Sequence, residues 1–377
     1  MTTYRMILTQ CAVCAIDLGL TSGKKCGRCS TRYCGPECQV QHWKEGGHDK
    51  VCKPIKRAGG AEQYHANKKY TEAVAVAVEK CAEDTKGQTC YICTQALHWK
   101  TKEGLVRGCS CRGTAGFAHV SCLAEQAKIL VAEAEENNLI AKVRTERFRR
   151  WDTCSLCEQE YHGIVRCALG WASWKTYLGR PERNEILILA MNRLGNGLDA
   201  ADHDADALCV REAELAMMRR LGSSQHNILV VQSNLATTYA RLRRPETLRM
   251  KRHVYTGRLR LNGEEDRLTL IAALNYATWL VALERCEEAK SLLRKPISIA
   301  RRVLDDSNDL TLRMRWMCAV ALYKSTGATL DDLREAATTL EEIERTARRV
   351  LGGAHPTTKA IEVALREVRK KIQNYTN

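Results

Sequence analysis

The sequence lacks the features that mark several large classes of proteins. No apolar run approaches the ~20 residues that a membrane-spanning helix needs. The opening segment MTTYRMILTQ lacks the charged-then-apolar pattern of a secretory signal. No phosphate-binding loop, H-E-x-x-H motif, nucleophile elbow or dinucleotide fingerprint is present. We therefore expect an intracellular protein, cytoplasmic or nuclear, that does not contact a membrane. We predict no catalytic side chains and no organic cofactor.

Cysteine, in contrast, is abundant and unevenly spread. Of the 19 cysteines, seven lie between Cys11 and Cys52 and seven between Cys90 and Cys157. Clustered cysteines in a chain without a secretion signal are typical of metal ligands, because disulfides are rare inside cells. Four others lie in expected helical stretches and are interpreted as packed or inert: Cys167, Cys209, Cys286 and Cys318.

The balance of charges is basic, at a formal +15. Zinc-bound cysteines are thiolates, which would bring the metallated chain to about +9. A basic chain is compatible with an acidic protein surface or with nucleic acid as a partner, and net charge alone decides neither. Nucleic acid is the weaker of the two alternatives here, because only the charge suggests it.

The first cluster offers nine candidate ligands in short pairs. They are Cys11, Cys14, Cys26, Cys29, Cys34, Cys38, His42, His48 and Cys52. Two tetrahedral zinc sites need eight ligands, so one histidine is surplus.

The spacing favours one of the two histidines. His48 precedes Cys52 by four positions, which places both side chains on one face of a helical turn. His42 would have to reach Cys52 across the glycine pair 46–47, which predicts the end of a helix. We therefore predict that His48 is the ligand.

The string CAVC-x11-CGRC-x3-YC-x3-CQ-x2-HW-x4-H-x3-C, residues 11–52, resembles a MYND zinc finger. The resemblance implies two interleaved, closed structural zinc sites and a role in binding proline-containing peptides of partner proteins. It assigns Cys11, Cys14, Cys34 and Cys38 to one zinc, and Cys26, Cys29, His48 and Cys52 to the other. His42 is then left as a scaffold or partner-facing residue beside Trp43.

The second cluster has eight candidates in the order of four cysteines, one histidine and three cysteines. This number again predicts two zinc ions, four in the whole chain. Interleaving would group Cys90, Cys93, His119 and Cys122 on one ion, and Cys109, Cys111, Cys154 and Cys157 on the other. Plant homeodomain fingers share this ligand order.

Finer details distinguish the second cluster from those fingers. The C-x-C at 109–111, the following RGTAGFAHVSCL and the Ala/Glu-rich helical stretch before Cys154 resemble the RING-CH family of membrane-associated ubiquitin ligases. The resemblance covers about 90–162. It implies that a ubiquitin-conjugating enzyme docks on an apolar surface that includes Ile92, which could instead belong to the small core. The family's usual tryptophan, four residues after Cys122, is Gln126 here, and the family's transmembrane helices are lacking.

The C-terminal half repeats with a period near 40 residues. Segments 235–263, 276–306 and 318–353 each read as helix, turn and helix, with Ala236, Ala277 and Ala319 at one point of each first helix. Such a period is typical of helical solenoids. The units resemble the tetratricopeptide repeats of kinesin light chains over roughly 183–375, and the helix beginning at Pro356 would cap them.

These patterns together predict a mainly α-helical protein in four parts. Residues 1–55 form a MYND-type finger, 56–89 a helical connector, 90–162 a RING-CH-like zinc domain and 163–377 a tetratricopeptide-like solenoid. We expect a zinc-binding scaffold for protein–protein interaction, and one hypothesis is that it is a ubiquitin ligase or ligase subunit whose repeats hold the substrate. The alternative is a non-catalytic adaptor that binds partner peptides.

Overall fold

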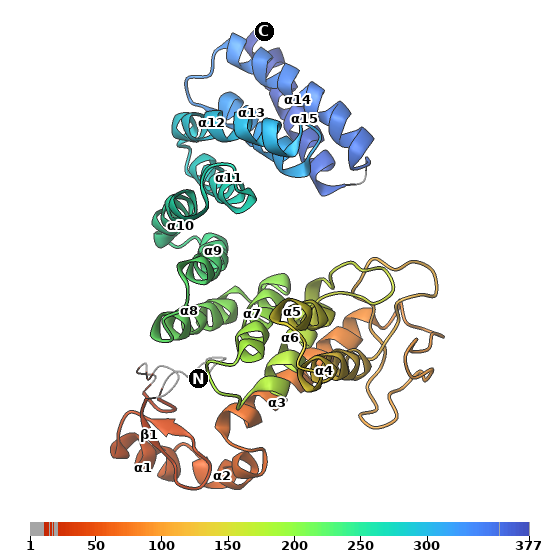
Figure 1. The fold of residues 1–377 in the computed structure, drawn as a ribbon, viewed down its shortest axis with the longest axis vertical. Coiled ribbons are helices and arrows are strands. Elements are labelled where there is room, and N and C mark those ends of the chain that lie inside the picture. Colours follow the sequence, from red (N-terminus) through yellow and green to blue (C-terminus); the bar gives the residue numbers. More distant parts are fainter. Residues whose placement is uncertain (1–10, 15, 17, 19–21, 354, 377) are drawn as a thin grey trace. The chain divides into compact units, whose positions relative to one another are not determined.

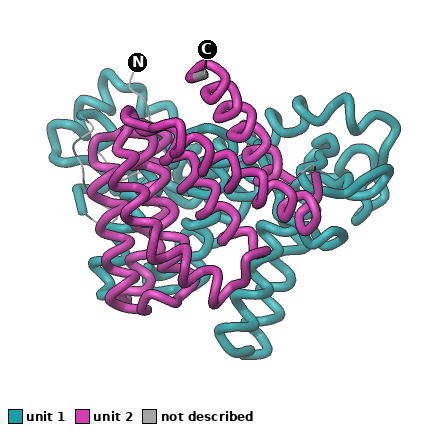
Figure 2. Tube along the Cα trace, turned by 90° about the horizontal axis from the view of Figure 1, so that it is seen from above, with its two compact units in different colours: residues 1–223 teal, residues 224–377 magenta. Residues whose placement is uncertain are grey.

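The computed structural model describes residues 11–14, 16, 18, 22–353 and 355–376. The opening segment 1–10, part of the predicted first domain, lies outside the described residues. The chain is mainly helical (Figure 1) and divides into two compact units, Met1–Ser223 and Ser224–Asn377, which Figure 2 colours separately. We call them unit 1 and unit 2. The solenoid predicted over 163–377 spans the division between them.

Unit 1 begins with a small finger. A two-stranded antiparallel ribbon, β1 (Lys24–Lys25) and β2 (Arg32–Tyr33), precedes two short helices, α1 (Pro36–Lys44) and α2 (His48–Arg57). Pro36 occupies the first turn of α1, where its missing N–H costs no hydrogen bond. Gly47 separates the helices at φ 71°, a left-handed conformation that glycine adopts without strain. The glycine pair therefore ends the helix where the sequence predicts.

The connector is a long helix, α3 (Ala61–Cys81), that belongs to the main core of unit 1. It packs against α6 (Gly163–Tyr177), which in turn packs against α7 (Glu185–Ala200), and α8 (Asp204–Arg220) follows. Two glycines allow α6 and α7 to approach closely. A Cβ on Gly197 would lie 2.8 Å from the carbonyl oxygen of Arg166, and one on Gly170 would lie 3.0 Å from that of Arg193.

The second cysteine-rich region lies between α3 and α6. Its loops carry an isolated bridge between Val106 and Ala118, and the helical stretch expected before Cys154 forms α4 (Val120–Glu136), α5 (Ala141–Phe148) and the short 3-10 helix η1 (Arg149–Trp151). Phe148 and Trp151 are buried beneath these helices. This packing joins the zinc-binding loops to the helical core.

Unit 2 consists of antiparallel helix pairs. They are α9 (Gln225–Arg241) with α10 (Glu246–Asn262), α11 (Arg267–Ala282) with α12 (Cys286–Leu304), and α13 (Asp309–Lys324) with α14 (Leu330–Val350), followed by α15 (Pro356–Thr376). Each helix packs on the next along the chain. The predicted small positions Ala236, Ala277 and Ala319 are all buried. The helix–turn–helix repeats expected from the period near 40 are therefore present.

No helix in the described part of the chain combines the length and the apolar character needed to cross a lipid bilayer.

Candidate metal centres

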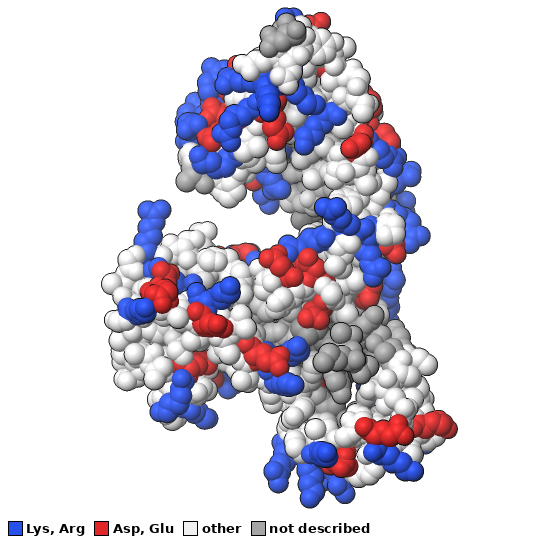
Figure 3. Space-filling view, turned by 180° about the vertical axis from the view of Figure 1, so that it is seen from behind, with Lys and Arg blue, Asp and Glu red and all other residues white. Residues whose placement is uncertain are grey.

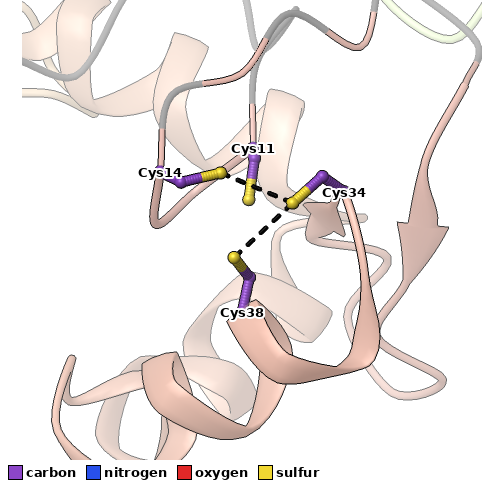
Figure 4. A group of neighbouring side chains, drawn as sticks. All are labelled: Cys11, Cys14, Cys34 and Cys38. Carbon is purple, nitrogen blue, oxygen red and sulfur yellow. Dashed lines mark hydrogen bonds between the residues drawn. The ribbon is translucent and has the colours of Figure 1, made fainter.

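The first group of thiols comes together within the finger (Figure 4). Cys11 and Cys14 come from the loop before β1, Cys34 follows β2 and Cys38 lies in the first turns of α1. Their sulfur atoms all lie within 4.8 Å of one another. The Sγ–Sγ distance is 3.4 Å for Cys14 and Cys34, and 3.5 Å for Cys34 and Cys38. A tetrahedral zinc with Zn–S bonds of ~2.3 Å separates its sulfurs by about 3.8 Å, so the group fits the ion.

The second group of the finger is more deeply buried. Cys26, Cys29, His48 and Cys52 bring their donor atoms within 4.8 Å of one another, and all four side chains are buried. The Sγ of Cys29 lies 3.3 Å from Nε2 of His48. Zinc bonds of ~2.3 Å to sulfur and ~2.0 Å to nitrogen predict about 3.5 Å for this edge. Both α2 donors come from one face of the helix, as the spacing predicts.

His42 lies beside this second group and outside it. Its side chain is 8% exposed, and its Nδ1 lies 3.0 Å from the hydroxyl of Tyr33. The ring packs 4.9 Å from the ring of His48, centroid to centroid. A Cβ on Gly46 would lie 2.4 Å from the His42 ring, so only glycine leaves room for it. Of the two roles that the sequence left open for His42, the structure therefore shows the scaffold.

A third group forms around the first knuckle of the second cysteine region. It comprises Cys90, Cys93, His119 and Cys122. The Nδ1 of His119 lies 3.4 Å from the sulfur of Cys93 and 3.5 Å from that of Cys122. Its other ring nitrogen, Nε2, lies 3.3 Å from the carbonyl oxygen of Ala96. Such a bond fixes the tautomer that leaves Nδ1 free to bind metal.

The fourth group contains only cysteines: Cys109, Cys111, Cys154 and Cys157. The sulfurs of Cys111 and Cys154 lie 3.8 Å apart, although 43 positions separate them in the sequence. A Cβ on Gly116 would lie 3.1 Å from the sulfur of Cys109, so the glycine lets the backbone pass close to this site. The structure thus brings together the same four sets that interleaving assigns.

Backbone N–H groups lower the pKa of some cysteines in these groups, and neighbouring thiols raise the pKa of others. Burial opposes the ionisation of Cys11, but backbone N–H groups of Cys14 and Cys34 outweigh it and lower the pKa of Cys11 to about 6. Beside it, the Cys34 thiol raises the pKa of Cys38 to about 12. Four thiolates cannot collect at one point without a cation, whereas a divalent ion stabilises them. The donor chemistry therefore matches zinc.

Each of the two zinc knuckles of the second region also exposes an aliphatic side chain. Ile92, between the first pair of cysteines, is 37% exposed, and Leu156, between the last pair, is 51% exposed. The hydroxyl groups of the preceding residues, Tyr91 and Ser155, lie 2.9 Å apart. This hydrogen bond holds the two knuckles side by side. Leu156 was not predicted from the sequence, where its only signal is its place inside a C-x-x-C pair like that of Ile92.

Gln126 lies in α4 and is partly buried. Its Oε1 is buried and has no hydrogen-bond partner among the described residues. An unsatisfied amide oxygen is unfavourable where an apolar side chain could pack.

Comparison with known proteins agrees with the two zinc regions. Residues 11–52 match the family model described as the MYND finger, and residues 90–157 match that of the RING-variant domain. No curated protein matches the chain in sequence.

Among solved structures, similarity lies with repeat proteins. A Podosopora anserina protein with nearly identical TPR-like repeats of a kinesin light chain is 17% identical, with a TM-score of 0.41, over 61% of this chain and 97% of that one. BtubC (BKLC) from P. vanneervenii is 14% identical, with a TM-score of 0.45, over 63% of this chain and 94% of that one.

Four Cys/His groups of matching chemistry thus lie within the two matched regions, and antiparallel helix pairs follow them. The chain therefore carries four candidate zinc sites in two regions that match the MYND finger and RING-variant domain models, followed by repeated helix pairs.

Proposed function

We propose that this zinc-binding interaction scaffold recruits a ubiquitin-conjugating enzyme through its RING-variant domain. The observation that carries the proposal is the exposed pair Ile92 and Leu156, which a hydrogen bond between Tyr91 and Ser155 holds together. Exposed aliphatic side chains on two hydrogen-bonded, metal-supported knuckles form a suitable anchor for an apolar partner surface.

The sixteen clustered cysteines and histidines are proposed as the zinc ligands. Bound zinc would supply only structural stability, because each group provides four protein donors and leaves no open position. The role of the protein is then to hold its partners in place. The knuckles hold the docking surface, and the MYND finger and the repeats offer further surfaces for protein partners.

A specific observation favours a second candidate function, that of a non-catalytic adaptor. Gln126 stands where the RING-CH family usually carries a tryptophan, and its amide oxygen has no partner in the described structure. A polar side chain there reduces the apolar area available to a conjugating enzyme. The adaptor would still bind partners through the finger and the repeats.

An in vitro ubiquitination assay with a panel of conjugating enzymes separates the two functions. If the domain is a ligase, the wild-type chain forms ubiquitin chains, and Ile92→Arg or Leu156→Arg abolishes them while zinc content stays unchanged. The matched control is Ile129→Arg, which changes an exposed aliphatic residue on α4 and should retain activity.

The same assay has outcomes that count against ligase activity. Wild-type activity no higher than that of a Cys90→Ala variant, which loses a proposed zinc ligand, would refute the ligase. Activity that appears only in Gln126→Trp would support the adaptor and show that the glutamine is the cause. Strong wild-type activity would remove the adaptor reading.

A further inference from the structure

The outer face of α10 carries a strip of arginines that the proposed function does not use. Arg249, Arg252 and Arg260 are exposed. At 100° per residue they fall within about 80° of the helix circumference and span about 16 Å along its axis. The strip faces away from the side that buries Val254 and Arg258 in the repeat. Figure 3 shows Lys and Arg side chains gathered over this part of unit 2, at the right-hand edge of the view.

The charges of this strip are not neutralised locally. Helix α10 holds five Lys or Arg residues and one acidic residue, whereas α14 holds four Lys or Arg residues and six acidic residues. Among the described residues of unit 2, the guanidinium groups of Arg249, Arg252 and Arg260 form no hydrogen bond or ion pair. Elsewhere in the unit, Arg301 pairs with Asp306 at 2.6 Å and many other arginines are likewise paired.

Glu288, an acidic group close enough to Arg252 for their charges to interact, is already engaged. Glu288 accepts two hydrogen bonds from Arg285, at 2.6 and 2.7 Å, and this contact lowers the pKa of Glu288, with a smaller contribution from Arg252. Arg252 therefore keeps its donors for a partner. Arg243 and Arg244, exposed in the turn before α10, extend the basic surface toward its N-terminal end.

An apolar side chain flanks the arginines and indicates the kind of partner. Leu259 is 38% exposed and lies about 20° around the helix from Arg252. The aromatic side chain of α10, Tyr255, is partly buried and packs near Tyr276, with 6.4 Å between the ring centroids. Among the described residues, the strip therefore offers no exposed Phe, Tyr or Trp on which the bases of a single-stranded nucleic acid could stack.

We propose that the outer face of α10 binds an acidic protein segment that also carries aliphatic side chains. Carboxylates of the segment pair with Arg249, Arg252 and Arg260, and an aliphatic side chain covers Leu259. Carboxylate–arginine pairs of this kind are often bidentate, which gives the contact orientation as well as charge.

Fluorescence anisotropy on the full zinc-loaded chain tests the proposal. The probe is a labelled 14-residue peptide that alternates Glu with Leu, measured beside a Glu/Ser peptide, a DNA duplex, single-stranded RNA and vesicles with one-third anionic lipid. The test variant changes Arg249, Arg252 and Arg260 to Gln. The control variant makes the same change at three arginines of α14: Arg334, Arg345 and Arg348. Circular dichroism and zinc content establish that both variants fold.

The test variant should bind the Glu/Leu peptide about tenfold more weakly than wild type, as expected from three exposed charge pairs. The control should bind within about twofold of wild type, and the Glu/Ser peptide should bind wild type more weakly than the Glu/Leu peptide. Equal losses in the two variants would overturn the proposal, since the binding would then follow net charge. Absence of peptide binding, or tighter strip-dependent binding of nucleic acid or vesicles, would also overturn it.

Discussion

Replacing His48 with alanine should cost the finger its second zinc ion, whereas replacing His42 should not. His48 places its Nε2 3.3 Å from the sulfur of Cys29, inside the buried donor group. His42 contacts the Tyr33 hydroxyl and the His48 ring from outside that group. Zinc measured per chain should therefore fall from four to three in His48→Ala, or to two if the whole finger unfolds. It should stay at four in His42→Ala.

The two variants should also differ in how much free energy of stabilisation the finger loses. A structural zinc site contributes about 10–16 kcal/mol of apparent binding free energy, and a finger of this size buries too little surface to fold without it. His42→Ala leaves the buried Tyr33 hydroxyl without its partner, which costs about 1–3 kcal/mol. It should thus weaken the finger without emptying the site.

Inductively coupled plasma mass spectrometry after gel filtration gives the zinc count, and competition with a colorimetric chelator gives the relative affinity. Release of zinc by His42→Ala together with full retention by His48→Ala would refute the assignment and the geometric reasoning behind it.

Three further predictions concern stability. Gly197→Ala places a methyl group 2.8 Å from a backbone oxygen of α6 and should lower the free energy of unfolding by about 1–3 kcal/mol, measured by urea denaturation, while Gly327→Ala, where the structure leaves open space, should change it little. Arg211→Met leaves the buried carboxylate of Glu214 without its ion-pair partner and should lower the free energy of unfolding by about 3–5 kcal/mol. Arg211→Met combined with Glu214→Leu should lower it by less, and equal losses would contradict this. Burial lowers the pKa of His65 from 6.5 to about 4, so between these pH values the folded chain binds fewer protons than the unfolded chain, and the free energy of unfolding falls as the pH falls. His65→Asn should therefore reduce the loss of stability between pH 7.5 and 5.5 by about 1 kcal/mol. An unchanged pH dependence would contradict this.

The metal groups could be predicted from the sequence because their ligands lie in short local pairs. A pair two to four residues apart fixes its own geometry, and only the pairing between pairs depends on the fold. His48 and Cys52 illustrate this, since one turn of α2 aligns them. The repeat helices could also be predicted, because small and apolar residues recur at a constant period.

Other features depend on contacts between distant positions. The Tyr91–Ser155 hydrogen bond joins residues 64 positions apart, so the apolar pair that it supports could not be read from either knuckle alone. The connector showed a helical pattern, but its packing against α6 depends on tertiary structure. The unpaired state of the α10 arginines likewise depends on which acidic side chains neighbouring helices bring near.

The most direct test is the number of zinc ions bound by the purified 377-residue chain, measured by native mass spectrometry. The account predicts four ions, two in the MYND finger and two in the RING-variant domain, with all four released by a strong chelator. A value near two would mean that one of the two regions does not bind metal as proposed, and would contradict the central claim.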